Sequence, residues 1–148
     1  MATRSRIGIE LSNGDVLSVY HHWDGYPQWL GKTLNEHFNT TEKVSELIDG
    51  GDMSVCWTKD RWTGNKVAPH VIENKEVEEY GPQYYSQRGE DCPPRVNTLM
   101  EYMTDKEAGE EYHYLWSQKH TVWTCRDMHQ FQDGNPEFVD IPVDLYYY

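Results

Sequence analysis

The chain has 148 residues, and 25 acidic against 13 basic side chains give it a formal net charge of -12 at pH 7. This length suits one domain around a single core. An acidic surface repels nucleic-acid phosphates and anionic lipids, so we expect neither nucleic acid nor membrane as a direct partner. Two kinds of function remain compatible with the charge: a local basic pocket for a small anion, or mimicry of a nucleic acid towards a basic protein.

Aromatic residues make up 14% of the chain, with six Trp and eleven Tyr. Each aromatic ring buries a large area, so this content predicts a folded core despite the charge. Surplus Tyr and Trp are also typical of interfaces, which indicates a partner or a homo-oligomer. The three cysteines are widely spaced and odd in number, which favours a reducing cytoplasm over a disulfide framework. We expect no signal peptide and no membrane span.

The N-terminal segment predicts a β-hairpin. Residues 7–11 alternate between apolar and other side chains, and residues 16–21 continue in the same way. Asn13-Gly14 between them is a dipeptide that accepts the positive φ angles of tight hairpin turns.

Two helices are expected next, because the apolar period changes to three and four residues after position 27. The apolar faces consist of Trp29 or Leu30, Leu34, His37 and Phe38 in the first helix, and of Val44, Leu47 and Ile48 in the second. Thr40 or Thr41 is the predicted N-cap of the second helix. Gly50-Gly51 is its predicted end.

The remaining elements complete an α+β domain. We predict short strands at 53–57 and 84–86, a short helix at 97–103, and a second hairpin from strands 111–116 and 121–125. Residues 58–80 give a weak signal, and the tail 127–148 is expected to be irregular and to pack on the domain or on a neighbouring subunit. The predicted fold is a single domain over residues 1–148, with an antiparallel sheet from two hairpins and two consecutive helices on one face.

The stretch from His21 to Leu34 combines imidazole, indole, phenol, carboxylate and ammonium groups between a strand and a helix. Such a turn holds side chains rigidly while exposing them. We therefore predict a slot in which an aromatic ring stacks on a flat ligand and polar groups bind its edge. The predicted ligand contacts are His22, Trp23, Asp24, Tyr26 and Lys32. The structural alternative is an aromatic turn packed on the core, with Asp24 capping backbone donors.

Other chemistries fit this stretch less well. Gly31-Lys32-Thr33 resembles the end of a phosphate loop, but the position of the first glycine is occupied by Tyr26. Lys32 is therefore predicted as an isolated anion contact near a helix start. His21 and His22 point to opposite faces of a strand, and no zinc spacing occurs, so no metal is predicted.

An enzymatic alternative uses His22 and Asp24 as an acid–base pair. We expect His22 to be hydrogen-bonded to a loop carboxylate. No Ser or Cys nucleophile lies in a recognisable motif, and Cys56 and Cys125 are predicted to be buried in strands. We therefore predict no catalytic residue and no cofactor, and favour a protein that is not an enzyme.

Arg88 is the second candidate for an anion contact, because arginine binds phosphate or carboxylate with two parallel hydrogen bonds. The alternative is a surface arginine paired with Glu90 or Asp91, which contributes little. The rings of Tyr112, Tyr114 and Trp116 share one strand face and are predicted to lie in the core or in an oligomer interface.

The motif Tyr-x-His-Trp-Asp-Gly-Tyr-Pro at 20–27, followed by Gly-Lys-Thr-Leu at 31–34, resembles a family of small proteins from bacteriophages and some bacteria. The resemblance covers residues 4–57 well, and Arg88-Gly89-Glu90 and the aromatic strand at 111–116 continue it loosely. It implies a phage-encoded accessory protein acting in the host bacterial cytoplasm. It implies no reaction.

Three functional hypotheses follow. The first is a counter-defence protein that binds and sequesters a small nucleotide-like host signal. The second is an acidic protein that inhibits a basic host protein by charge mimicry, with carboxylates from 73–79 and 105–111. The third is a small hydrolase that uses His22 and Asp24.

Overall fold

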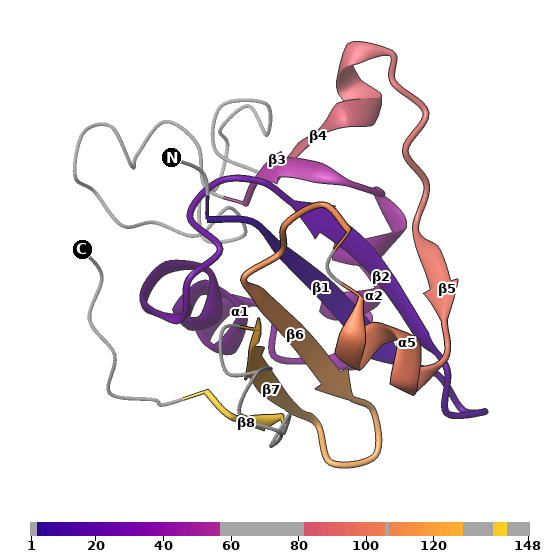
Figure 1. Ribbon diagram of the computed structural model, residues 1–148, viewed down its shortest axis with the longest axis vertical. Coiled ribbons are helices and arrows are strands. Elements are labelled where there is room, and N and C mark those ends of the chain that lie inside the picture. Colours follow the sequence, from indigo (N-terminus) through magenta and orange to yellow (C-terminus); the bar gives the residue numbers. More distant parts are fainter. Residues whose placement is uncertain (1–2, 57–81, 106, 129–137, 142–148) are drawn as a thin grey trace.

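The computed structural model describes residues 3–56, 82–105, 107–128 and 138–141 (Figure 1). The strands are β1 (Ser5–Glu10), β2 (Val16–His21), β3 (Met53–Val55), β4 (Gln83–Tyr84), β5 (Arg95–Asn97), β6 (Tyr112–Ser117), β7 (Val122–Asp127) and β8 (Val139–Asp140). The helices are α1 (Lys32–His37), α2 (Thr41–Asp49) and α5 (Leu99–Thr104), with a π-helical turn at Pro27–Gly31 and a 3-10 helix at Tyr85–Arg88. The α+β class and both hairpins are confirmed.

The strands form one sheet in the order β4-β3-β2-β1-β6-β7-β8, and β5 also pairs with β2. The hairpins β1–β2 and β6–β7 are antiparallel, as predicted, but they join through a parallel pair in which Ile7 lies opposite Tyr114. The expectation of a purely antiparallel sheet is therefore wrong, and the sheet is mixed. The chain passes through the helices before β6 returns beside β1, and a crossover of that kind produces a parallel neighbour.

Helices α1 and α2 pack on one face of the sheet, as predicted, and we call this side the core face (Figure 1). Alternate residues of the strands meet the apolar sides of the helices there. Buried members include Ile7, Val19, Leu30, Leu34, Ile48, Tyr114, Trp116 and Trp123. The indole N–H groups of Trp116 and Trp123 find acceptors, since Trp116 donates to Thr41 Oγ1 at 3.0 Å and Trp123 donates to Phe38 O at 2.8 Å.

The helix ends follow the sequence signals. Thr40 is the N-cap of α2, and its hydroxyl accepts a hydrogen bond from Lys43 N at 3.2 Å. Gly51, just beyond the helix, has a φ of +87° that favours glycine. The first predicted helix differs in detail, because a π-helical turn from Pro27 precedes the short α1.

Helix α5 crosses the opposite face of the sheet, which we call the second face (Figure 1). A reciprocal pair of hydrogen bonds between Thr98 and Glu101 starts this helix. Its buried Tyr102 packs over Gly8 and forms a small apolar cluster with Val16 and Leu115.

The predicted weak segment 58–80 and most of the predicted tail lie outside the described residues. Within the tail, Val139–Asp140 form β8 beside β7, and Ile141 is buried in the core. Among the described helices, none is both long and apolar enough to cross a membrane.

Candidate functional site

The turn after β2, residues 22–26, is tied to three parts of the fold. Trp23 N donates to Ser54 O and Gly25 N donates to Thr3 O, each at 2.8 Å, and the Tyr114 hydroxyl donates to Gly25 O at 2.7 Å. A side chain at position 25 would run into Ser5. The backbone of the turn is therefore held from both strand neighbours and from the core.

His21, the last residue of β2, and His22, the first residue of the turn, lie on opposite faces, as predicted. His21 is buried on the core face, where its Nε2 accepts from Cys56 N at 3.2 Å. His22 is half-buried on the second face, and its Nδ1 lies 2.7 Å from the Tyr20 hydroxyl. The expectation that a loop carboxylate binds His22 is wrong. Tyr20 takes that place because residues two apart in a strand project from the same face.

Trp23 is the one Trp, Tyr or Phe among the described residues whose side chain is exposed, with 42% of its surface accessible. Its ring meets the His22 ring edge-on, with centroids 4.7 Å apart and planes at 88°. An indole that is both exposed and oriented is a distinctive surface feature, because single large aromatic residues are usually buried or at interfaces.

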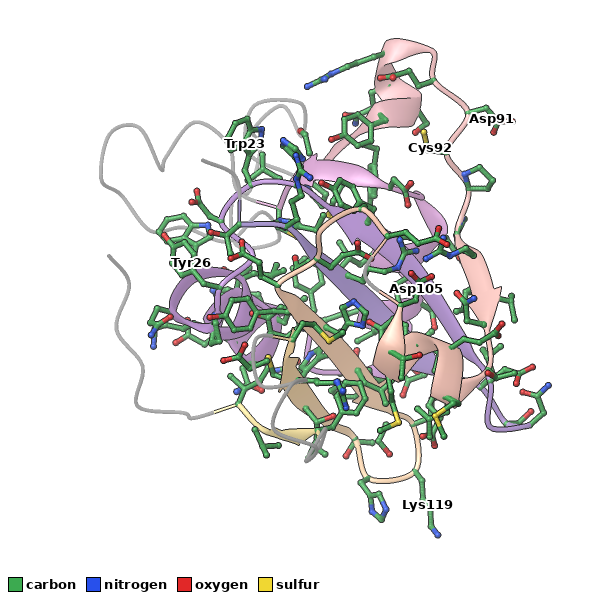
Figure 2. The ribbon with its side chains drawn as sticks, viewed as in Figure 1. Trp23, Tyr26, Asp91, Cys92, Asp105 and Lys119 are labelled. Carbon is green, nitrogen blue, oxygen red and sulfur yellow. The ribbon has the colours of Figure 1, made fainter. Side chains whose placement is uncertain are left out.

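The other predicted aromatic residue lies elsewhere. Tyr26 is half-buried and packs against the core. Figure 2 shows Trp23 at the end of the sheet near β3, whereas Tyr26 lies beside α1. Asp24, between them, has a φ of +56° and is half-buried. The structure therefore separates the two rings that the sequence placed in one slot.

The two predicted cations are also apart. Lys32 Nζ pairs with Glu36 Oε1 at 2.8 Å along α1. Arg88 lies on the exposed 3-10 helix, which projects from the body on the side away from α1 (Figure 1), and its guanidinium stacks 5.5 Å from the Tyr85 ring centre. The structure therefore does not bring Lys32 or Arg88 together with Trp23 and His22.

Two arginines that the sequence reasoning missed lie next to the turn. In the β1–β2 ladder Arg6 is opposite Tyr20, and continuing the ladder by two residues brings Arg4 opposite His22. Arg4 Nη1 donates to Ala108 O at 2.8 Å, and Arg6 Nε donates to Ser18 Oγ at 3.0 Å. The signal was present in the sequence, since a hairpin centred on Asn13 pairs these positions.

The charges of these arginines act on the site. Burial lowers the pKa of His22, and the positive charge of Arg4 lowers it further, so His22 is neutral near pH 7. Burial raises the pKa of Tyr20, and Arg4 opposes that rise. Burial and the charge of Arg95 lower the pKa of Arg6. The guanidinium groups of Arg4, Arg6 and Arg95 therefore act on this face together with the carboxylates of Asp52 and Glu110.

The described thiols are poor nucleophiles. Cys56 and Cys125 are both buried, as predicted, and burial raises the pKa of each to about 12. A thiol protonated at neutral pH reacts slowly. Within the described segments no group of three or more His, Cys, Asp or Glu side chains gathers to hold a metal ion.

Comparison with protein-family models, with curated proteins and with solved structures finds no significant match. The candidate site therefore stands on its own geometry: an exposed indole, a neutral imidazole, a phenol and nearby guanidinium groups.

Proposed function

We propose that the protein binds a small, planar, negatively charged ligand of the nucleotide type at the turn after β2. We call Tyr20, His22 and Trp23 the turn site. The observation that carries the proposal is the exposed Trp23 ring, held edge-on by His22, which is itself held by the Tyr20 hydroxyl.

A fixed, exposed indole is suited to stacking on a flat ring. Stacking of one base on an aromatic side chain contributes about 1–3 kcal/mol. The orientation of Trp23 costs little on binding, because its backbone N–H already bonds Ser54 O and its ring already rests on His22.

His22 supplies a polar group for the edge of the same ligand. Its Nδ1 is engaged by Tyr20, so its Nε2 remains to donate to, or accept from, the ligand. Because the imidazole is neutral, this contact selects a hydrogen-bonding edge, and Arg4 supplies the nearby positive charge.

The resemblance to bacteriophage proteins gives the proposal its setting. We propose a counter-defence accessory protein that sequesters a nucleotide-like signal in the host cytoplasm without changing it chemically. The charge-mimicry alternative is less well supported within residues 105–111, because Asp105 pairs with Arg95 and Glu110 is buried. The segment 73–79 that it also needs lies outside the described residues.

Binding is tested by thermal unfolding of the purified protein with linear and cyclic nucleotides. A ligand at about a hundred times its Kd adds about 2.7 kcal/mol to the free energy of unfolding and raises Tm by several degrees. We expect Trp23→Ala to lose this shift while it keeps its own unfolding transition. Met100→Ala, which shortens a 69% exposed side chain on α5, is the matched control and should keep the shift.

A shift unchanged in Trp23→Ala, or no shift with any nucleotide, contradicts the proposal. Recovery of altered ligand after denaturation would favour the hydrolase alternative. Capture of a basic host protein that is lost steeply with salt, in the absence of any nucleotide shift, would favour charge mimicry.

A further inference from the structure

We propose that Arg4 and Arg6, which we call the arginine pair, bind a phosphate-type anion on the second face of the sheet. The proposal rests on the proposed function only in that the anion is assigned to the ligand of the turn site. It assigns the contacts to the anion to residues of β1 and its N-terminal extension, and not to Lys32 or Arg88.

Both side chains project to the same face. Ile7 and Ile9 of β1 are buried on the core face, so Arg6 points to the second face. Glu111 N donates to Arg4 O at 2.8 Å, which extends the β1–β6 pairing to Arg4 and keeps the alternation. Arg4 and Arg6 are therefore successive side chains of one strand face.

The arginine pair donates only to neutral oxygens within the described part of the chain. Arg4 bonds Ala108 O, and Arg6 bonds Ser18 Oγ at 3.0 Å and Ser18 O at 3.3 Å. No described carboxylate lies within 4 Å of either guanidinium. Each guanidinium has five N–H donors, so several remain for a ligand.

This lack of carboxylate partners is unusual in a protein with 25 acidic and 13 basic residues. Arg95, on the neighbouring β5, shows that a pair can form on this face, since it lies 3.4 Å from Asp105 Oδ2. Arg6 is only 6% exposed, and a buried charge without a directly paired counter-charge lowers stability. A bound anion would supply that counter-charge.

The number of donors favours phosphate over carboxylate. Two guanidiniums offer more N–H groups than the two oxygens of one carboxylate accept, whereas phosphate presents three terminal oxygens and pairs with the arginine fork. Arg4 is exposed and supplies the accessible contact, while Arg6 lies deeper. Asp52 and Glu110 act on Arg6 without direct contact and raise its pKa, whereas burial and the positive charge of Arg95 lower it.

The arginine pair adjoins the turn site. The backbone of Arg6 lies opposite Tyr20 while its guanidinium bonds Ser18, and the charge of Arg4 acts on His22. An anion held by the pair therefore reaches the turn site through Arg4. One nucleotide therefore has a place for its phosphate on β1 and for its base at the turn.

The test uses pyrophosphate and inorganic phosphate as probes, measured by calorimetry at fixed ionic strength. We expect pyrophosphate to bind the full-length protein and Arg4→Gln to weaken it by about tenfold or more, as expected for loss of hydrogen bonds to a charged group. Arg4→Gln changes an exposed side chain, so it should fold. Arg6→Lys is the second variant and keeps the charge while removing the fork. Arg88→Gln is the matched control and should leave affinity unchanged.

The outcomes separate this proposal from the proposed function. Pyrophosphate binding that needs Arg4 but not Trp23, without any nucleotide shift, supports the arginine pair and contradicts the nucleotide function. Nucleotide binding that needs Trp23 but is unaffected in both Arg4→Gln and Arg6→Lys overturns the arginine pair alone. Equal loss in Arg88→Gln, or no binding of either probe or of any nucleotide phosphate, also overturns it. Binding of nucleotides but not of free phosphate, with loss in Arg4→Gln, supports a nucleotide as the source of the anion.

Discussion

The core face and the second face are built from the same strands, but their chemistry is opposite. On the core face, Ile7, Tyr114 and Cys125 follow one another across β1, β6 and β7. The second face carries an adjacent row of polar side chains: Tyr20 on β2, Arg6 on β1, His113 on β6 and Arg126 on β7. The last three of these are buried.

The contrast between the two faces shows how a small acidic domain can keep charged side chains buried. Helices α1 and α2 supply apolar side chains to one face, which provides the hydrophobic stabilisation. The second face is closed by α5 through specific hydrogen bonds, such as the one from the Tyr102 hydroxyl to Tyr114 O at 2.5 Å. Polar side chains are tolerated there because another face already stabilises the fold.

The largest expected effect is on the core face. Leu30→Ala should lower the free energy of unfolding by about 2–5 kcal/mol, since Leu30 is fully buried and its truncation leaves a cavity. Urea unfolding followed by circular dichroism measures this. Leu115→Ala, in the small cluster of the second face, is the comparison and should fall at the lower end of that range. A larger loss for Leu115→Ala would contradict the division of roles between the faces.

The second expected effect is a pH dependence that arises on the second face. His113 is fully buried, and burial lowers its pKa from 6.5 to about 4, although its Nδ1 hydrogen bond to Tyr102 O at 2.6 Å opposes this. The charges of Arg6 and Arg126 also lower it, and Asp105 raises it. Glu110 Oε2 lies 3.8 Å from Nε2, beyond hydrogen-bond distance. His113 is therefore neutral in the folded protein at pH 6.

The unfolded chain protonates this histidine near pH 6.5, whereas the folded protein does so only near pH 4. Between pH 6.5 and pH 4, proton binding by His113 therefore favours the unfolded chain. The free energy of unfolding should fall by about 3 kcal/mol as the pH drops through this range. His113→Asn keeps a donor for Tyr102 O and removes the titrating group, so it should flatten the profile between pH 7 and 5. An equally steep profile in the variant would contradict the assignment.

Local patterns predicted the hairpins and the helices because each depends on neighbours in sequence. The Asn13-Gly14 turn and the caps at Thr40 and Gly50 are signals of that kind. The parallel pairing of β1 with β6 was not predictable in this way, because no local pattern states which distant strand will lie beside Ile7. The sheet order follows from packing over the whole chain.

The candidate site was likewise predictable only in part. The opposite orientations of His21 and His22 follow from strand alternation and were predicted. The hydrogen bond between His22 and Tyr20 was not predicted, because a loop carboxylate was expected as the partner of His22, whereas Tyr20 lies on the same strand face. Lys32 and Arg88 were grouped with Trp23 by residue type alone, and their positions depend on how α1 and the 3-10 helix are placed.

The smallest expected effect tests how tightly α5 closes the second face. A Cβ at Gly8 would lie 2.9 Å from the Tyr102 ring and 2.8 Å from Val16 Cγ1, so Gly8→Ala should cost about 1–3 kcal/mol by overpacking. Glycine inside a strand often marks such a close approach. Val16→Ala removes one of the two obstacles, and the double variant should therefore lose less stability than the sum of the two single losses. Additive losses would mean that Gly8 matters for the strand itself and not for the packing of α5.

The same substitution should also change the pH dependence. Because Tyr102 accepts the hydrogen bond of His113 through its carbonyl oxygen, a displaced Tyr102 in Gly8→Ala should weaken that contact as well. Because that hydrogen bond raises the pKa of His113, its weakening should lower the pKa further. The free energy of unfolding of Gly8→Ala should then fall more steeply with decreasing pH than that of the unaltered protein, which links the packing and the charge of the second face in one measurement.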